Sequence, residues 1–405
     1  MKYVFLSAVL FVIPDFYPWL SIPCTFIFLV PLFTNSSLSC TKGLSWGLVV
    51  CSVKCSWFLM LLTTKRCGGI DIVPGFFLWL CTILWMSLFS AAWFWAITKF
   101  PRIAAMLLST IMFFCVMIFG CMVPFGVLEG YPFFNPLVPL AQYPAMLWSV
   151  QRVGFLGIIS FLIMLQMFFA RWLAEKKTKD ILLTFLCLLP FFLGPFFYQP
   201  TTIPVHDIHY IKPWWYGCSN NPAFVGYAIV DELARVATDL PIGSVILMPE
   251  STFCFELDDH KEFVSLWSSS ARDATILFGG HRRIKDIVLN SFVMVQDGKV
   301  VHVYDKQHLM PFIERSVEFF GCAHKKHSSA DDLICLNRQA YQVFMCSELF
   351  FESKKVKGYP IILIANESWL CCDYMKKLAV LFIQYFELKY NKPVLYATTQ
   401  GMSNV

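Results

Sequence analysis

Cys346 is the side chain in this sequence that is best placed to act as a nucleophile. It ends the apolar run Tyr341-Gln-Val-Phe-Met-Cys346, and a carboxylate follows two residues later at Glu348. The run predicts a buried strand, and α/β proteins present reactive groups at the carboxyl end of a strand, beside a loop. The alternative is an inert cysteine that packs in the core, because cysteine is among the most buried residue types.

Two other segments have the same form, an apolar strand that runs into a charged side chain. Ser244-Val-Ile-Leu-Met-Pro-Glu250 ends in a carboxylate, and Lys299-Val-Val-His-Val-Tyr-Asp-Lys306 ends in a lysine. If the three strands lie side by side in one sheet, Glu250, Lys306 and Cys346 meet at one edge. A carboxylate that takes the thiol proton, an ammonium that stabilises an oxyanion and an attacking thiolate make a complete set for acyl transfer.

Five motifs follow one another along the second half of the chain. They are Met248-Pro-Glu-Ser251, Tyr304-Asp-Lys-Gln-His-Leu-Met-Pro-Phe-Ile-Glu314, Met345-Cys-Ser-Glu348, Asn366-Glu-Ser-Trp369 and Ala397-Thr-Thr-Gln-Gly401. In order and context they resemble the motifs of the nitrilase superfamily, and within it the sequence is similar to the apolipoprotein N-acyltransferases, bacterial inner-membrane enzymes that add the third acyl chain to lipoproteins. Two positions depart from that pattern: Ile313 stands where the family usually has glycine, and Ser347 where it usually has an aromatic residue.

The resemblance implies a fold and a catalytic triad. The fold is a polytopic α-helical membrane domain joined to an α/β domain of the nitrilase type, which is a four-layer α-β-β-α sandwich. Glu250 is then the general base, Lys306 stabilises the oxyanion and Cys346 is the nucleophile. Glu314 and Glu348 would orient Lys306 and the nucleophile's loop, although each could instead be an ordinary solvated acid.

The resemblance also implies the substrates and their contacts. We expect a phospholipid as acyl donor and an apolipoprotein as acceptor, with no cofactor, no metal, no nucleic acid and a monomeric enzyme in the bilayer. Trp214, Trp215 and Trp369 would bind substrate. For the first two, a place in the membrane-interface belt or in the core is the alternative.

Composition divides the chain into two halves of different character. Of its 405 residues, 57% are apolar and 17% aromatic, which is too apolar for an ordinary soluble protein. We count 12 Lys and Arg and 5 Asp and Glu before residue 204, against 32 and 27 in the whole chain. Residues 1–200 are therefore predicted to form a membrane domain and residues 201–405 a water-soluble catalytic domain.

Seven membrane spans are expected in the first half. Residues 3–33 are interrupted by Pro14, Pro18 and Pro23, which favours two short spans joined by a turn at Asp15. A cleavable signal peptide is the alternative there, but more spans follow it and no clean cleavage site is present. The other five spans, each near the roughly 20 residues that cross a bilayer, are Gly43–Leu62, Val73–Thr98, Ile103–Phe125, Gly154–Ala170 and Ile181–Tyr198.

The basic residues of the short loops predict the orientation, because Lys and Arg concentrate on the cytoplasmic side. With a cytoplasmic amino terminus, the outer loops hold only Lys65, Arg66 and Arg152, and seven crossings place the second half in the periplasm. The inner loops then hold Lys2, Lys42, Lys99, Arg102, Arg171, Lys176, Lys177 and Lys179.

Two features of the first half permit a functional or a structural interpretation. Lys54 lies inside an apolar helix, where a charge is often functional, but its side chain could also extend to the interface. The loop at 129–136 is rich in aromatic residues and proline; it resembles a segment that lines the family's lipid cleft and also fits an interfacial aromatic belt.

The 16 cysteines predict no particular disulfide and no zinc site. A domain outside the cytoplasm could form disulfides, yet spacing alone gives no pairing. Cys371 and Cys372 could form a vicinal disulfide or two packed thiols. Zinc is not expected, because no Cys-x-x-Cys occurs and His324 and His327 have no matching cysteine pair.

Three functions fit the sequence. The first is lipoprotein N-acylation. The second is hydrolysis of amides or nitriles by a membrane-tethered member of the same superfamily, with water as acceptor. The third is a diverged, inactive relative in a conjugative transfer complex, because the sequence stops at Val405, whereas the family continues through further strands and an eighth span. The resemblance thus implies a catalytic domain truncated at its C-terminus. Retention of all three triad residues argues for an enzyme.

Overall fold

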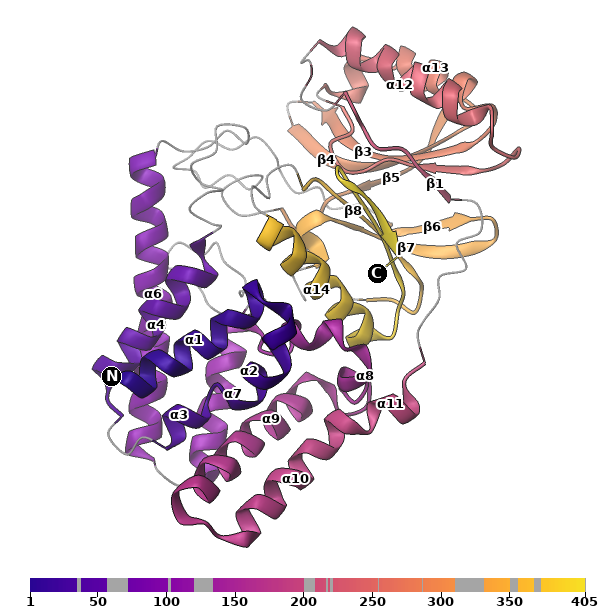
Figure 1. Ribbon diagram of the computed structural model, residues 1–405. Coiled ribbons are helices and arrows are strands. Elements are labelled where there is room, and N and C mark those ends of the chain that lie inside the picture. Colours follow the sequence, from indigo (N-terminus) through magenta and orange to yellow (C-terminus); the bar gives the residue numbers. More distant parts are fainter. Residues whose placement is uncertain are drawn as a thin grey trace. The chain divides into compact units, whose positions relative to one another are not determined.

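The chain forms two compact units in the computed structural model (Figure 1). We call them the helical unit, Met1–Pro200 with Leu370–Asn391, and the sheet unit, Thr201–Trp369 with Lys392–Val405. The chain thus leaves the sheet unit once and returns to it. The structure describes residues 1–34, 38–56, 72–100, 103–119, 134–199, 208–215, 218, 221–253, 255–285, 287–309, 331–349, 356–367 and 373–404.

In the described part of the helical unit, three helical segments are long and apolar enough to cross a membrane. They are Trp79–Lys99, Val150–Glu175 and Thr178–Phe197, and they correspond to three of the seven expected spans. The helices are α1 (Lys2–Phe16), α2 (Ser21–Ile27), α3 (Val30–Phe33), α4 (Cys40–Lys54), α6 (Ile72–Lys99), α7 (Ile103–Phe119), α8 (Pro144–Leu147), α9 (Val150–Glu175), α10 (Thr178–Phe192) and α11 (Gly194–Phe197), with the short 3₁₀ turns η1 (Pro18–Leu20) and η4 (Val138–Gln142).

The first helices are shorter than a full span, as the prolines predicted. α1 runs through Pro14 and Asp15 to Phe16, and η1 follows. The turn therefore lies slightly later than the expected position at Asp15, because a proline in a helix removes one hydrogen bond without always ending the helix.

Small residues allow α4 and α6 to pack closely. Gly43 and Gly47 of α4 are four residues apart and face Ser87 and Ser90 of α6. A Cβ atom on Gly47 would lie 2.8 Å from the Cα of Ser87, which is closer than real Cβ contacts allow. Such small-residue contacts are typical of helices that pack within membranes.

Lys54 is buried and paired. Its ammonium lies 2.5 Å from a carboxylate oxygen of Asp15, and the two side chains are 2% and 0% exposed. The ammonium also lies 4.8 Å from the centre of the Phe11 ring, a distance typical of a cation–π contact. The structure therefore excludes the interpretation in which Lys54 extends to the surface.

The sequence predicts a helix at 373–390, before the strand at 393–397, and α14 (Asp373–Tyr390) has these bounds; it belongs to the helical unit. It packs against η4, α8 and α9, which precede it by about 200 residues of sequence. Its buried apolar side chains include Leu378, Phe382 and Phe386. In sequence it connects β8 (Ile361–Ala365) with β9 (Val394–Thr398), two parallel neighbours of one sheet.

The described residues of the sheet unit form two mixed five-stranded sheets. The first sheet has the order β1-β2-β3-β4-β5; β1, β2 and β3 are parallel, and β4 is antiparallel to its neighbours β3 and β5. The second sheet has the order β10-β9-β8-β7-β6; β7, β8 and β9 are parallel, and the edge strands β6 and β10 pair antiparallel with β7 and β9. The remaining strands are β1 (Ile208–Tyr210), β2 (Val245–Leu247), β3 (Thr275–Ile284), β4 (Ile287–Gln296), β5 (Lys299–Asp305), β6 (Leu333–Leu336), β7 (Gln339–Met345) and β10 (Gly401–Asn404).

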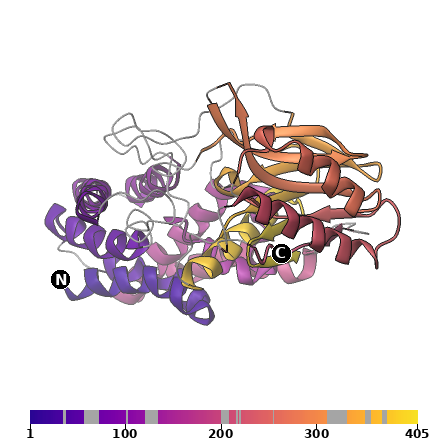
Figure 2. The same cartoon turned by 90° about the horizontal axis from the view of Figure 1, so that it is seen from above.

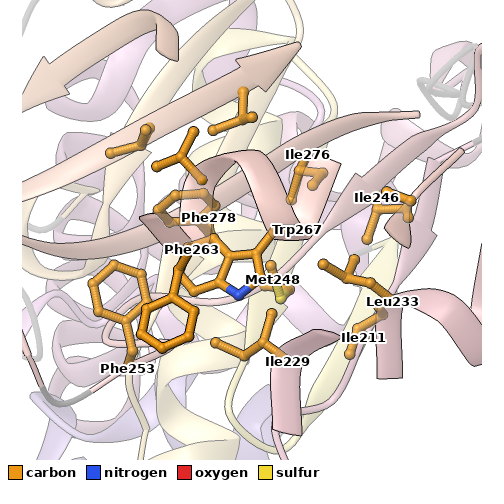
Figure 3. Packing of buried hydrophobic residues seen from close by; sticks show 14 of the residues in the cluster. Ile211, Ile229, Leu233, Ile246, Met248, Phe253, Phe263, Trp267, Ile276 and Phe278 are labelled. Atoms are coloured by element: carbon orange, nitrogen blue, oxygen red, sulfur yellow. The ribbon is translucent and has the colours of Figure 1, made fainter. Parts of the chain in front are cut away.

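Two helices cover one face of the first sheet. The sequence predicts helices at 221–238 and 259–271, and the structure has α12 (Pro222–Ala237) and α13 (Glu262–Ser270) there, side by side (Figures 1 and 2). Trp267 is fully buried at the centre of the cluster that they form with the sheet (Figure 3). Its indole N–H donates to the Gly226 carbonyl oxygen at 3.1 Å, so this large side chain also links α13 to α12.

The opposite face of the first sheet packs on the second sheet. One core cluster contains Leu277 and Phe292 from the first sheet together with Val343, Ile362 and Leu395 from the second. The sheet unit therefore has the layer order helix, sheet, sheet. The fourth layer of the expected sandwich stays a prediction.

The dipeptide Asp297-Gly298 between two apolar runs predicts a hairpin turn, and the structure has this turn between β4 and β5. Both residues have positive φ, 50° and 73°, which is the conformation of the two central residues in a type I′ turn. The hairpin aligns β5 on β4, and Lys306 follows the end of β5 directly.

Candidate active site

The three expected catalytic residues follow strands of two different sheets. Glu250 follows β2 and Lys306 follows β5, both in the first sheet, whereas Cys346 follows β7 in the second. The expectation of a single shared sheet edge is therefore wrong. β7 pairs with β6 and β8 instead, and the face-to-face packing of two sheets replaces the side-by-side arrangement.

Glu250 is buried and accepts hydrogen bonds at both carboxylate oxygens. Oε1 accepts from the Lys306 ammonium at 2.9 Å and from the Asn290 side-chain amide at 2.7 Å. Oε2 accepts from the backbone N–H of Asn366 at 2.9 Å. Three elements thus fix one carboxylate, because Asn290 lies in β4, Lys306 follows β5 and Asn366 follows β8.

Lys306 is held at both ends. Its ammonium is paired with Glu250, with the two side chains 1% and 3% exposed. Its backbone N–H donates to the Asn290 carbonyl oxygen at 2.9 Å. A buried charge pair is stable only when its hydrogen bonds are well formed, so Asn290 supports both partners of this pair.

Cys346 adopts an unusual backbone conformation at the junction of β7 and the short turn η6 (Cys346–Leu349). Its φ is +42°, in the left-handed region that residues other than glycine rarely occupy. Its side chain is buried and is present as a thiol. Backbone strain of this kind gathers at functional sites, which favours the nucleophile over the inert core cysteine.

Glu348 joins the loop of Lys306 to the turn of Cys346. Its Oε1 accepts from the Tyr304 hydroxyl at 2.6 Å and from the Gln307 N–H at 2.7 Å. Its Oε2 accepts from the Met345 N–H at 3.0 Å. The side chain is fully buried, so it is not a solvated acid, and it fixes the backbone on either side of the site.

Tyr304 is a permanent hydrogen-bond donor to that carboxylate. Burial, followed by the charge of Glu348 and the hydrogen bond to it, raises the pKa of the Tyr304 phenol far above its ordinary value. The raised pKa favours the protonated phenol, which is the form that donates to Glu348.

A second buried tyrosine and carboxylate, which the sequence analysis did not single out, lie close to the triad. The Tyr396 hydroxyl donates to Glu367 Oε1 at 2.6 Å, and both side chains are buried. Burial and the charge of Glu367 are the main causes that raise the pKa of Tyr396, and electrostatic interactions with Cys346 and Glu250 add to them. Asn290 was missed as well, although an amide inside the apolar strand β4 is a signal that could have been noticed.

The two adjacent tryptophans have different environments. Trp215 is buried, and its indole N–H donates to the Thr252 carbonyl oxygen at 2.7 Å. It therefore braces the loop that follows Glu250, which favours the core interpretation for this residue. Trp214 is 54% exposed and its ring lies edge-on to Phe224 at 6.4 Å between centroids.

Several expected features lie outside the described residues. They are Glu314, Trp369, Ile313, residues 129–133, and the pair Cys371 and Cys372, together with His324 and His327. Among the residues that the structure describes, no group of three or more His, Cys, Asp or Glu side chains is arranged to hold a metal ion.

Gly279 of β3 allows the Glu250 backbone to approach the sheet. A Cβ atom there would lie 2.6 Å from the Cα of Glu250, and the Gly279 N–H donates to the Pro249 carbonyl oxygen at 3.1 Å. Gly279→Ala should therefore displace Glu250 and slow the reaction of Cys346 on the order of 100-fold, since a misplacement of about 1 Å has such effects.

Peptide mass spectrometry of Cys346 alkylation by iodoacetamide measures this effect. Gly358→Ala is the matched control, because no atom lies within 4 Å of the added Cβ. Equal alkylation rates in the two variants would show that Gly279 does not position the carboxylate.

The arrangement can carry out acyl transfer through a thioester. A carboxylate with three hydrogen-bond donors can accept and return a proton, and the adjacent ammonium can stabilise negative charge on a carbonyl oxygen. The thiol at the strained turn supplies the attacking atom.

No family model and no curated protein matches the sequence. Solved structures show partial similarity. A CN-hydrolase superfamily protein from Xanthomonas campestris has 16% identity and a TM-score of 0.35, with 48% of this chain and 76% of that chain covered. An amidase from the nitrilase superfamily, from Nesterenkonia, has 13% identity and a TM-score of 0.36, with 47% and 74% covered. A glutamine-dependent NAD+ synthetase from Acinetobacter baumannii has 14% identity and a TM-score of 0.31, with 44% and 36% covered.

Proposed function

We propose that this protein is a membrane-bound acyltransferase of the nitrilase superfamily. It moves a fatty acyl chain from a phospholipid to the terminal amino group of a lipid-modified lipoprotein cysteine. The observation that carries the proposal is the buried Glu250–Lys306 pair, joined through Glu348 to the strained turn of Cys346. The five sequence motifs described above supply the superfamily and the branch.

The first half of the reaction forms a thioester. Glu250 accepts the thiol proton of Cys346, and the sulfur attacks the ester carbonyl of the phospholipid. Lys306 and backbone N–H groups stabilise the oxyanion. The carbon–sulfur bond then forms fully, the ester carbon–oxygen bond breaks, and Glu250 returns its proton to the departing oxygen, which releases a lysophospholipid.

The second half transfers the acyl chain to an amine. The α-amino group of the lipoprotein cysteine attacks the thioester carbonyl, and a carbon–nitrogen bond replaces the carbon–sulfur bond. Glu250 accepts the amine proton and passes it to the thiolate. The free enzyme is thereby restored, and no cofactor enters the scheme.

The membrane setting of the proposal rests on the three apolar helical segments of span length. Both proposed substrates carry acyl chains that do not leave the bilayer, so a membrane-anchored enzyme meets them at high local concentration. We place the protein in a bacterial inner membrane with the sheet unit on the periplasmic side, as the distribution of basic residues predicts. Trp214 is the described aromatic residue that we assign to lipid contact.

Intact-protein mass spectrometry tests the donor. The detergent-purified full chain is incubated with dipalmitoyl phosphatidylethanolamine beside its Cys346→Ala variant. We expect one added palmitoyl group on the first protein and none on the second. A folded protein that gains no acyl group at Cys346 would contradict a phospholipid donor.

A chase distinguishes transfer from hydrolysis. The acylated protein is mixed with a synthetic peptide that begins with S-diacylglyceryl cysteine, or with the same peptide acetylated at its amino terminus. We expect the free amine alone to accelerate loss of the adduct and to gain the palmitoyl group. Release of palmitic acid at one rate with both peptides would instead identify a hydrolase that uses water.

A further inference from the structure

A pair of buried side chains, Tyr396 and Glu367, lies behind the carboxylate that we assign as general base. We propose that this pair is a positioning device for Glu250, which it holds through the backbone N–H of Asn366. The proposal deepens the proposed function and rests on it in one respect, the assignment of Glu250 as the base that serves Cys346.

The geometry begins where β8 ends. β8 pairs in parallel with β9, with Leu363 opposite Tyr396 and Ala365 opposite Thr398. The chain then leaves the sheet through Asn366 and Glu367. The Asn366 N–H donates to Glu250 Oε2 at 2.9 Å, so the position of this short segment sets the position of the base.

Two hydrogen bonds fix Glu367 to the neighbouring strand. Its carboxylate accepts from the Tyr396 hydroxyl at 2.6 Å, and its backbone N–H donates to the Thr399 hydroxyl at 3.2 Å. Tyr396, Glu367 and Thr399 are all at most 6% exposed. The peptide that presents the Asn366 N–H is therefore adjacent to a residue held by both its side chain and its backbone.

The end of β9 is itself anchored to the first sheet. The Tyr210 hydroxyl of β1 donates to the Thr398 carbonyl oxygen, and the Thr398 hydroxyl accepts from the Gln400 N–H at 3.1 Å. β9 is thus held by β8 in its own sheet and by Tyr210 of the first sheet. Tyr396 therefore has a fixed position, and its hydrogen bond fixes Glu367, which is next to the Asn366 N–H that binds Glu250.

The Tyr396 phenol is a constant donor. Burial first, then the charge of Glu367 and the hydrogen bond to it, and then the charges of Cys346 and Glu250, raise the pKa of Tyr396 well above its ordinary value. Glu250 itself contacts Lys306 and Asn290 from the first sheet and the Asn366 N–H from the second.

Tyr396→Phe should alter the pH dependence of the site. Loss of the hydroxyl frees Glu367, and the Asn366 N–H then moves away from Glu250. A carboxylate that loses an N–H donor ionises less readily. As the pH is lowered, the alkylation rate of Cys346 should therefore begin to fall at a higher pH than in the unchanged protein. If the Tyr396 hydroxyl served only the fold, its loss would lower the stability of the protein without changing the pH dependence of Cys346 alkylation.

Three further variants distinguish the hydrogen bond that positions Glu367 from the negative charge of Glu367. Glu367→Gln keeps an oxygen that accepts from the Tyr396 hydroxyl, so its profile should resemble that of the unchanged protein, whereas Glu367→Ala should resemble Tyr396→Phe. Tyr341→Phe is the matched control, because Tyr341 is 4% exposed and lies in β7, two strands from β9 in the same sheet. Its profile should not move.

The experiment measures iodoacetamide alkylation of the Cys346 peptide across pH in the full-length protein, so it needs no acyl substrate. An unshifted profile in folded Tyr396→Phe would overturn the positioning role, as would a shift in Glu367→Gln as large as that in Glu367→Ala. A shifted profile in a protein that accepts no phospholipid acyl chain would keep the positioning role and reject the proposed donor.

Discussion

Replacing Cys346 with alanine should abolish the covalent acyl intermediate completely. In the proposed reaction the sulfur is the atom that bonds to the acyl carbon, and a methyl group cannot replace it. Enzymes that lose their nucleophile typically retain only the small acceleration that binding and oxyanion stabilisation supply. We therefore expect no adduct on the variant at any time at which the unchanged protein is fully acylated.

Cys335→Ala provides the control for this result. Cys335 is an exposed thiol in β6 of the same sheet, so its loss removes a reactive sulfur without touching the turn at Cys346. The control should be acylated at the unchanged rate. Full acylation of Cys346→Ala, or loss of acylation in Cys335→Ala with the fold intact, would reject Cys346 as the nucleophile.

Replacing Lys306 with methionine should slow acylation by a factor on the order of 10² to 10³, which is the usual effect of removing one group that stabilises an oxyanion. The change should also destabilise the protein. The Glu250 carboxylate stays buried without its ammonium partner, and such a loss costs about 3–5 kcal/mol of unfolding free energy. Stopped-time mass spectrometry and chemical denaturation measure the two effects separately.

The double variant Lys306→Met with Glu250→Gln distinguishes the two effects. A neutral amide at position 250 removes the buried charge and keeps one acceptor oxygen, which can serve either the Asn290 or the Asn366 donor but not both, so part of the lost stability should return. Acylation should remain slow, because neither the base nor the ammonium is present. Recovery of acylation together with stability would show that the pair serves the fold rather than the chemistry.

Several elements of the second half of the chain could be predicted from sequence, because their signals are local. The Asp297-Gly298 turn, the amphipathic helices α12 and α13 and the bounds of α14 all follow from patterns within about 20 residues. The pairing of strands could not be predicted in this way. An apolar strand such as β7 must bury the side chains on both faces and pair its backbone at both edges. Nothing within its sequence indicates which sheet it joins.

The same distinction holds for the site. Glu250, Lys306 and Cys346 each follow a recognisable apolar strand. Their chemical type and their place after a strand could therefore be recognised in the sequence. The donors that hold Glu250 were not, because one is a backbone N–H, at Asn366, which every non-proline residue carries. Tyr396 resembles any aromatic residue in a core strand until the fold brings it to Glu367.

The interruption of the sheet unit by α14 has a consequence for the order of folding. β9 and β10 are synthesised after α14, and they complete the sheet that carries Cys346. α14 buries its apolar side chains among helices made much earlier. β9 and β10 therefore join their sheet after α14 has been synthesised, and α14 needs the other helices of the helical unit to cover its apolar side chains. A fragment beginning at residue 201 would carry α14 without the helices that cover its apolar side chains, so we expect the sheet unit to assemble only after the helical unit has formed.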